Sequence, residues 1–282
     1  MELWLVSALL TVVLYGLGEG LSKEPTVRLG SARMLVLYAL ANVPIYVAWF
    51  FIGRGWEAVT PVGFALAVAS GVSGCLGTVF WFRAMESGTA SVVSGFSAAY
   101  PVITVAAAVM ILGATLVPLQ IVAIFFLMIG AVLLGIFENP GRTGGGRTWL
   151  VPMLLAITLW GAWGIVERLA IDAIGFPANA GIYVLVSTPL YLAVSWRGIR
   201  DPRIWDRVGM REAIPCLVLF AVAGATIFLA IGLGPIAIVV PLTTAYPVVA
   251  ILVRRFWMDE RMTFPQKFAV GLAMIGAALA SL

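Results

Sequence analysis

Long apolar segments dominate this sequence and decide which solvent the chain folds in. A helix needs about 20 mostly apolar residues to cross a bilayer. Ten such segments follow one another, separated by short polar breaks, near residues 3–21, 34–52, 61–82, 88–111, 117–137, 149–171, 179–196, 213–232, 235–256 and 264–282. Only 11% of the residues are charged, whereas soluble domains carry roughly 25%. The segments do not alternate as the strands of a membrane β-barrel do. We therefore expect an all-α integral membrane protein with ten transmembrane helices.

The chain repeats itself at an offset of about 145 residues. "WLVSALLTVVLYGLGEGLSK", which begins at Trp4, aligns with "WLVPMLLAITLWGAWGIVER", which begins at Trp149. The tetrapeptide "AYPV" occurs at 99–102 and again at 245–248. The register predicts a first five-helix repeat over 1–137, a linker over 138–148 and a second five-helix repeat over 149–282.

An odd number of spans in each repeat forces the second repeat to begin on the opposite face of the membrane. The two repeats are therefore expected to be inverted relative to each other. Charge supports this topology, because all 17 Lys and Arg residues except Arg54 and Arg168 fall in loops on one side of the ten spans. The positive-inside rule then places the basic face in the cytoplasm and both termini outside. We expect a multi-pass protein of the inner (plasma) membrane, whose net charge of +4 is a topology signal and not a nucleic-acid site.

Several of these segments also resemble a known family. "LYGLGEGLSK", "LWGAWGIVER", the paired "AYPV" tetrapeptides and "DERMTFPQKFAVGLAMIGAAL" are similar to EamA-type transporters of the drug/metabolite transporter superfamily, over essentially the whole chain. The resemblance implies two inverted halves that move metabolites by alternating access. It also implies a central cavity lined mainly by helices one, three, four, six, eight and nine. The family's acidic residue before the last helix of each half is present as Glu260, but "ILGATLVPLQ" lacks it in the first half.

The doubled Tyr-Pro motif suggests a mechanical element. Proline inside a helix removes an N–H donor and kinks the helix, and a buried tyrosine hydroxyl requires a hydrogen-bond partner. Pro101 and Pro247 are therefore predicted hinges in the fourth and ninth helices. The alternative is that Tyr-Pro only packs a bent helix against its equivalent in the other repeat.

Polar and aromatic side chains at membrane depth are the candidates for a solute site. Glu19 is the deepest carboxylate, and Lys23 lies four residues later on the same helical face. The alternative is that these ends lie at the interface, where long side chains reach the headgroups and Trp and Tyr are common. The predicted cavity residues are Tyr15, Glu19, Trp81, Ser94, Ser97, Tyr100, Trp160, Trp163, Glu167, Thr243, Thr244 and Tyr246.

The residues that most enzymes and metal sites need are scarce in this chain. It contains no histidine, and its two cysteines, Cys75 and Cys216, lie in apolar segments where free thiols are expected. "GRTGGGRT" has arginine in place of the lysine of a phosphate-binding loop and is predicted to be a flexible linker. We expect no enzyme activity, no metal and no cofactor.

Three functional classes remain open. The first is a secondary transporter that exports amino acids or similar polar solutes, because the hydroxyls near the Tyr-Pro motifs are neutral. The second is a proton-coupled multidrug or cation exporter that uses Glu19. The third is a membrane-embedded enzyme or lipid-handling scaffold. The expected partners are a small-molecule solute and the lipid bilayer; one chain suffices for a pathway, with a homodimer as the alternative.

Overall fold

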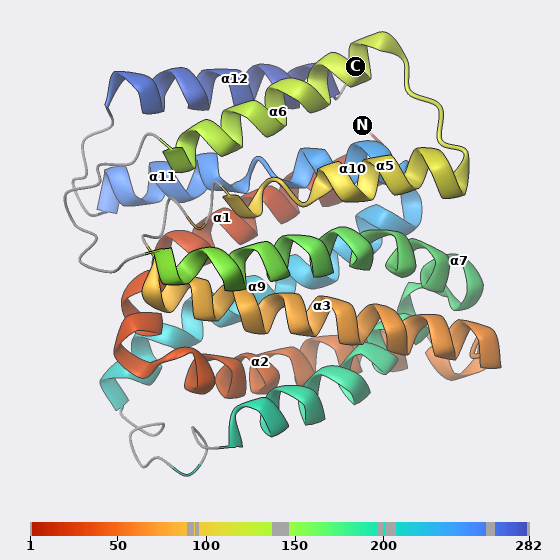
Figure 1. Ribbon diagram of the computed structural model, residues 1–282. Coiled ribbons are helices and arrows are strands. Elements are labelled where there is room, and N and C mark those ends of the chain that lie inside the picture. The colour runs from red at the N-terminus through yellow and green to blue at the C-terminus, as the bar shows by residue number, and fades with distance from the viewer. Residues whose placement is uncertain are drawn as a thin grey trace.

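Helices account for all the regular secondary structure in the described part of the chain, as expected. The computed structural model describes residues 2–88, 93, 96–136, 147–196, 200, 207–257 and 263–280. Its helices run roughly side by side across the view in Figure 1. They are α1 (Leu3–Leu29), α2 (Ser31–Ile52), α3 (Pro61–Ser87), α5 (Pro101–Leu112), α6 (Pro118–Ile136), α7 (Leu150–Val194), α9 (Arg207–Leu233), α10 (Ile236–Thr243), α11 (Tyr246–Trp257) and α12 (Phe264–Ala280), with 3-10 turns η1 (Gly55–Glu57) and η3 (Arg147–Trp149).

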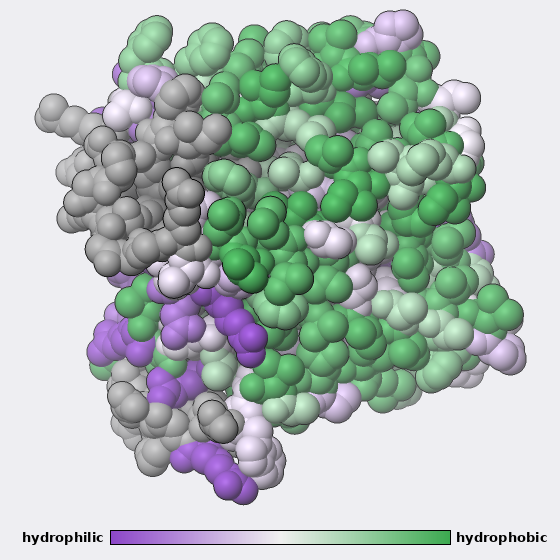
Figure 2. Space-filling model, viewed as in Figure 1, coloured by the Kyte–Doolittle hydropathy of each residue, from purple (hydrophilic) through white to green (hydrophobic). Residues whose placement is uncertain are grey.

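The surface has the character of a lipid-facing one. Among the described residues, six helical segments are long and apolar enough to cross a membrane: α1, α2, α3, α7, α9 and Ile236–Val253. Many large hydrophobic side chains are exposed, for example Met110 at 77% and Ile52 at 82%. Figure 2 shows hydrophobic side chains over the middle of one face and hydrophilic ones gathered mainly toward its left edge. Exposed apolar area on this scale is expected where lipid, not water, surrounds the chain.

The sixth and seventh predicted spans together form α7, within which the chain reverses its direction. α7 runs through 45 residues, and Gly175 within it has φ 72 and ψ 157, outside the helical region. A side chain strains this positive φ, whereas glycine adopts it readily. The chain turns back at that point (Figure 1), so α7 has a first arm before Gly175 and a second arm after it. The break falls inside the expected connection between residues 171 and 179 but is shorter than expected, because helical turns continue up to the glycine on both sides.

Other helices continue beyond their apolar segments. α1 was expected to end near residue 21 but runs through "SKEPTVRL" to Leu29, and it ends at Gly30, where φ is 81. α3 and α9 are likewise longer than their apolar parts. Polar side chains at the ends of a membrane helix reach interfacial water, so the helix continues until a residue such as Gly30 ends it.

The fourth and ninth predicted spans are broken, and a smooth kink at proline is the wrong description. Residues 98–100 form turns before α5, and Thr244 and Ala245 form a turn between α10 and α11. Pro101 is the first residue of α5 and Pro247 the second residue of α11. In the first turn of a helix, the N–H that proline lacks has no intrahelical partner anyway. The prolines therefore start new helices and do not distort continuous ones.

The two halves of the chain are intertwined. α3 of the first half packs along α7 of the second half, and α9 of the second half packs along α1 of the first. Two further pairs also join the halves, since α5 packs on α10 and α6 on α12. Figure 1 shows α6 and α12 together at one edge of the molecule. Each half thus completes its core with helices of the other.

Two cations, one in each half of the chain, cap the C-terminal ends of two of these helices. The Lys23 ammonium donates to the carbonyl oxygens of Met85 and Gly88 at the end of α3, at 2.6 Å each. The Arg168 guanidinium donates at 2.7 and 3.0 Å to carbonyl oxygens in the last turn of α9 and at Gly234. Cations at a helix C-terminus satisfy its unpaired carbonyls and interact favourably with its dipole. Lys23 and Arg168 align in the sequence repeat, so both halves use the same cap.

Removing either cap is expected to lower thermal stability. Hydrogen bonds to charged groups contribute about 1.5–3 kcal/mol each, and about 1 kcal/mol shifts the melting temperature by roughly 2–4 °C in a chain of this size. Lys23→Met and Arg168→Met should each melt several degrees lower in detergent. Arg54→Met is the control, because its exposed pair with Glu57 contributes little. Equal melting temperatures for all three variants would show that the caps do not stabilise the fold.

Candidate functional site

A cavity of about 120 Å³ lies at the centre of the bundle. Residues from α1, α2, α3, both arms of α7, α9, α10 and α11 line it, together with Tyr100 just before α5. A single water molecule needs roughly 10–15 Å³, so this space holds several waters or one small organic molecule. It lies where the two halves meet, because its lining residues come from both.

Most of the predicted cavity residues lie on its wall. Eight of the twelve line the cavity: Tyr15, Glu19, Trp81, Tyr100, Trp160, Trp163, Thr243 and Tyr246. Helices one, three, four, six, eight and nine contribute to the lining, as the family resemblance implied. The part that these side chains play in binding a solute stays a prediction.

The other four predicted residues lie elsewhere. Ser97, Glu167 and Thr244 are buried but do not line the cavity. Thr244 is bonded to its own helix, since its hydroxyl donates to the carbonyl of Pro241 at 2.6 Å. Ser94 lies outside the described residues, as does Glu260. These placements separate the site into a wall and a layer of buried polar groups behind it.

Sequence reasoning missed two helices that contribute to the wall. Tyr38 and Tyr46 of α2 and Tyr183 in the second arm of α7 line the cavity, although the second and seventh helices were not expected there. A signal was present, because Tyr38, Asn42 and Tyr46 recur every four residues and so share one helical face. Asn42 is fully buried. A polar residue flanked by two tyrosines at that spacing marks a face turned to the interior.

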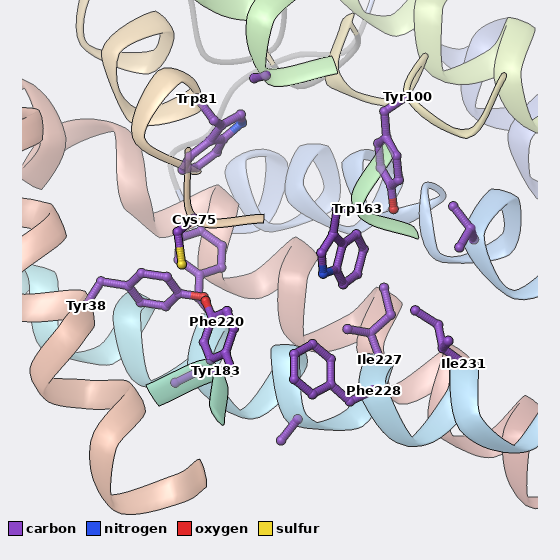
Figure 3. Close-up of a cluster of buried hydrophobic side chains, with 14 of the residues drawn as sticks. Tyr38, Cys75, Trp81, Tyr100, Trp163, Tyr183, Phe220, Ile227, Phe228 and Ile231 are labelled. Carbon is purple, nitrogen blue, oxygen red and sulfur yellow. The ribbon is translucent and has the colours of Figure 1, made fainter. Parts of the chain in front are cut away.

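Aromatic rings form most of the wall, and Figure 3 shows several of them converging. The ring centres of Trp81 and Phe220 are 5.7 Å apart, those of Tyr100 and Trp160 5.9 Å, and those of Trp163 and Phe228 6.4 Å. These separations fall in the range in which aromatic pairs attract one another. The wall therefore presents ring faces and edges, which suit an apolar or aromatic solute and also attract cations.

Glycines make room for the two indoles on α7. A Cβ atom at Gly74 would lie 2.9 Å from Cδ1 of Trp163, and one at Gly77 would lie 2.5 Å from Cδ1 of Trp160. Both distances are too short for real contacts, so any side chain here would push an indole away. The close approach of α3 to the first arm of α7 thus depends on these two positions.

Glu19 supplies the charge of the cavity. It is 1% exposed and is the one Asp, Glu, Lys or Arg among the described lining residues. The other polar lining groups, such as the hydroxyls of Thr78 and Thr243, are neutral at ordinary pH. A carboxylate at membrane depth is costly to bury and marks a functional position.

Glu167 forms a separate polar cluster behind the wall. The hydroxyl of Ser70 on α3 donates to one carboxylate oxygen of Glu167, and the amide of Asn179 donates to the other. The Trp163 indole lies one helical turn before Glu167 on the first arm of α7, so the two side chains are neighbours on one face of the helix. Because Trp163 lines the cavity, the cluster is one side chain away from the solute space.

The two broken spans hold each other through hydroxyl pairs. The hydroxyls of Ser97 and Tyr246 form a hydrogen bond across the repeats. A side-chain hydrogen bond also links Tyr100 to Thr243. Ser97 aligns with Thr243, and Tyr100 with Tyr246, at the repeat offset. The two pairs are therefore reciprocal: the tyrosine of each break pairs with a hydroxyl group of the other break.

A known protein family matches both halves of this helical bundle. A model of the EamA-like transporter family matches residues 2–136 and again residues 147–282.

The chain belongs to the EamA-like transporter family. The resemblance noted in the sequence is thereby confirmed, and it identifies a multi-pass membrane protein of a family of small-solute transporters, not of enzymes. A comparison with curated proteins finds no match. A solved structure described only as a crystal structure of a protein shares 18% sequence identity with this EamA-like chain. It aligns over 99% of this chain and 96% of its own with a TM-score of 0.72, which shows a common fold.

The described residues offer no metal site. No group of three or more His, Cys, Asp or Glu side chains among them could hold a metal ion. Cys75 and Cys216 are buried free thiols. The chemistry of the site is thus that of aromatic rings, hydroxyls and two carboxylates.

A substitution at Gly224 tests how tightly the wall is packed. A Cβ atom there would lie 2.2 Å from the hydroxyl oxygen of Tyr46, while the next contact is 3.5 Å away. Gly224→Ala is expected to destabilise the protein by about 1–3 kcal/mol through overpacking. The same change in a Tyr46→Phe background should cost far less, because the clashing oxygen is gone.

Thermal unfolding of the four proteins in this double-mutant cycle measures the coupling. Gly271→Ala is the matched control, since nothing lies within 4 Å of its Cβ position. Additive effects of the two substitutions would mean that the Tyr46 hydroxyl does not sit against α9.

Proposed function

We propose that this chain is a secondary transporter that carries a small organic solute across the membrane by alternating access between two inverted five-helix halves. Ten spans follow if α7 counts as two, α5 belongs to the fourth, and α10 with α11 forms the ninth. The reciprocal packing of the halves and the cavity between them support this proposal, because transporters with inverted repeats bind solute near the midplane at the repeat interface.

The composition of the wall favours a cationic solute. Glu19 is the one formally charged side chain among the described lining residues, and aromatic rings surround it. Two like charges 4 Å apart repel by roughly 4 kcal/mol at an effective dielectric of 20, so an ionised Glu19 disfavours a solute carboxylate. An amino acid would also find no lysine or arginine on the described wall to pair with its carboxylate. We therefore place an organic amine with an apolar or aromatic body ahead of an amino acid.

Outward movement is the direction that this solute class supports. A buried carboxylate that takes up a proton in one state of the cycle and releases it in the other couples proton entry to solute exit. Protons flowing into a cell then drive the cation out. Export is accordingly part of the proposal, as the second functional class from the sequence requires.

Three ligands that share one ring test the solute class. Phenethylamine carries an amine, 3-phenylpropionate carries a carboxylate, and phenylalanine carries both groups on the same skeleton. Phenethylamine is expected to bind at least about tenfold more tightly than the other two, which corresponds to 1.4 kcal/mol. Binding only to the folded state raises the melting temperature with ligand concentration, so thermal shifts of the purified protein rank the three.

Glu19→Gln provides the control for this ranking. The variant should lose most of the preference for the amine, because Gln keeps the shape of the side chain without its charge. Phenylalanine that binds as tightly as phenethylamine to the wild type would return the assignment to amino acids.

The breaks before Pro101 and Pro247 are proposed as the flexing points of the two gates. Both breaks lie against the cavity, since Tyr100 and Tyr246 line it. A proline in the first turn holds φ near −65°, so alanine there loosens the break without a large loss of stability. Because the halves are inverted, loosening the two breaks should move the cavity toward opposite faces.

Thiol labelling measures whether the two substitutions shift the cavity toward opposite faces. Cysteines at Ala98 and Thr244, which are equivalent positions of the two repeats, are placed one at a time in a protein with Cys75→Ala and Cys216→Ala. Pro101→Ala and Pro247→Ala are expected to change their labelling rates in opposite directions, and a tenfold change needs only about 1.4 kcal/mol. A cysteine at Arg203 reports which face is cytoplasmic, and labelling from outside would reverse the predicted orientation. Identical shifts in both proline variants would place gating elsewhere.

A further inference from the structure

Glu167 is a buried carboxylate without a cationic partner in the described part of the chain. Its side chain is 1% exposed, its hydrogen bonds come from the neutral groups of Ser70 and Asn179, and the neutral indole of Trp163 lies next to it. The neighbouring cation, Arg168, is engaged elsewhere, with Asp172 at 2.8 Å and with the end of α9. Burying an ionised carboxylate without a counter-charge costs several kcal/mol, and a group in this situation tends to bind a proton instead.

The groups that face Glu167 from neighbouring helices are also uncharged at ordinary pH. Tyr15 on α1, Tyr46 on α2 and Cys75 on α3 are the titratable side chains close enough to interact with it electrostatically. All three are acids whose neutral form predominates near pH 7. No charge in this surrounding compensates Glu167, so gain or loss of one proton changes the local charge by a full unit.

Protonation also changes what the carboxyl group can bond. An ionised carboxylate only accepts hydrogen bonds, whereas a protonated one donates through its O–H and has fewer acceptor sites. Ser70 lies on α3, Trp163 on the first arm of α7 and Asn179 beyond the reversal at Gly175. With one more proton, at least one of the donors has to turn away or reverse its bond. The cluster therefore has two hydrogen-bonding arrangements, one for each protonation state of Glu167. The change between them involves α3 and both arms of α7.

Trp163 connects this cluster to the cavity. Its indole projects into the centre of the aromatic cluster, between Tyr100 on one side and Phe228 on the other (Figure 3). It has little freedom, because α3 approaches it so closely that only glycine fits at position 74. A movement of the Trp163 indole that follows a change at Glu167 is accordingly passed on to the wall that a solute touches.

We propose that Glu167 binds one proton in each transport cycle and, by repositioning Trp163, couples that proton to the shape of the solute cavity. The proton comes from water on one side of the membrane, is held on a carboxylate oxygen of Glu167, and leaves to water on the other side; no covalent bond of the solute changes. Glu19 then has the separate task of meeting the solute inside the cavity. This division of tasks rests on the proposed transport function.

Tryptophan emission of the purified, solute-free protein tests the proposal directly. Wild-type emission should change as the pH is moved from acidic to alkaline, because protonation of Glu167 moves the Trp163 indole. Glu167→Gln and Trp163→Phe should each abolish that change. Glu19→Gln should keep it, and so should Trp160→Phe, whose indole donates to the carbonyl of Gly74 at 3.3 Å and not to Glu167. A wild type without the pH response, or a Glu167→Gln variant that retains it, would overturn the proposal.

A second variant guards against misfolding of Glu167→Gln. Ser70→Ala keeps the titratable group but removes a neutral donor that stabilises its charged form. Its emission response should remain and move to higher pH, and an unmoved midpoint would contradict the role given to this cluster. The infrared band of a protonated carboxyl group gives the same test without tryptophan, since Glu167→Gln should remove a band that Glu19→Gln leaves in place.

Transport in liposomes separates coupling from transport itself. With phenethylamine as probe, Glu167→Gln should keep solute–solute exchange at a wild-type rate and lose at least tenfold of the accumulation driven by a pH gradient. Equal loss of both activities would mean a structural part for Glu167 and would overturn the proposal. Absence of phenethylamine transport in the wild type would contradict the proposed function alone, because the emission and infrared experiments need no solute.

Discussion

A helix that breaks inside a bilayer frees backbone groups that lipid cannot bond, and every such group has to find a partner within the protein. This chain breaks its helices at the turns before α5 and between α10 and α11, and it places both breaks in the interior, against the cavity. Hydroxyl groups satisfy part of the freed backbone, as when Thr243 and Thr244 donate to the carbonyls of Val240 and Pro241. The hydroxyl pairs between the breaks then hold the two halves together where both are weakest. The irregular backbone is thus stable only because the halves face each other.

The sequence carried enough information to predict the helices, but their ends depend on other features. Apolar runs placed the spans because lipid exposure demands them, and two copies of the pattern supported each other. The ends depend on single residues, such as Gly30 and Gly175, whose positive φ has no signature in hydropathy. The Tyr-Pro motif was recognised as special, yet a proline reads the same in sequence whether it kinks a helix or begins one. Only the neighbouring turns, which end the preceding segment, settle the matter.

The candidate site shows the same division. Glu19, Trp160 and Trp163 could be predicted, because charged and aromatic side chains stand out in an apolar segment. Tyr38, Tyr46 and Tyr183 were missed because the resemblance pointed to other helices. The four-residue spacing of Tyr38, Asn42 and Tyr46 marked one face of α2, but the packing of α2 on α7 and α9 is what turns that face to the cavity. Glu167 was predicted as a wall residue and lies behind the wall instead. Its depth along the helix was readable from the sequence; its rotation, fixed by Ser70 and Asn179, was not.

The exchange of helices between the halves bears on how such a chain arose. Because α3 packs along α7 and α9 along α1, a single half lacks the surfaces that bury its own first and third helices. An ancestral protein the length of one half would therefore have needed a second copy of itself to complete its core, and in the inverted arrangement proposed above that copy lies upside down in the same membrane. Its loops would have carried a charge bias weak enough to let one sequence enter in both orientations. Fusion through a linker then fixes one orientation for each copy, and from that moment the two copies are free to become different. Glu19, which aligns with Gly164, and Glu167, which aligns with Ser22, already show this.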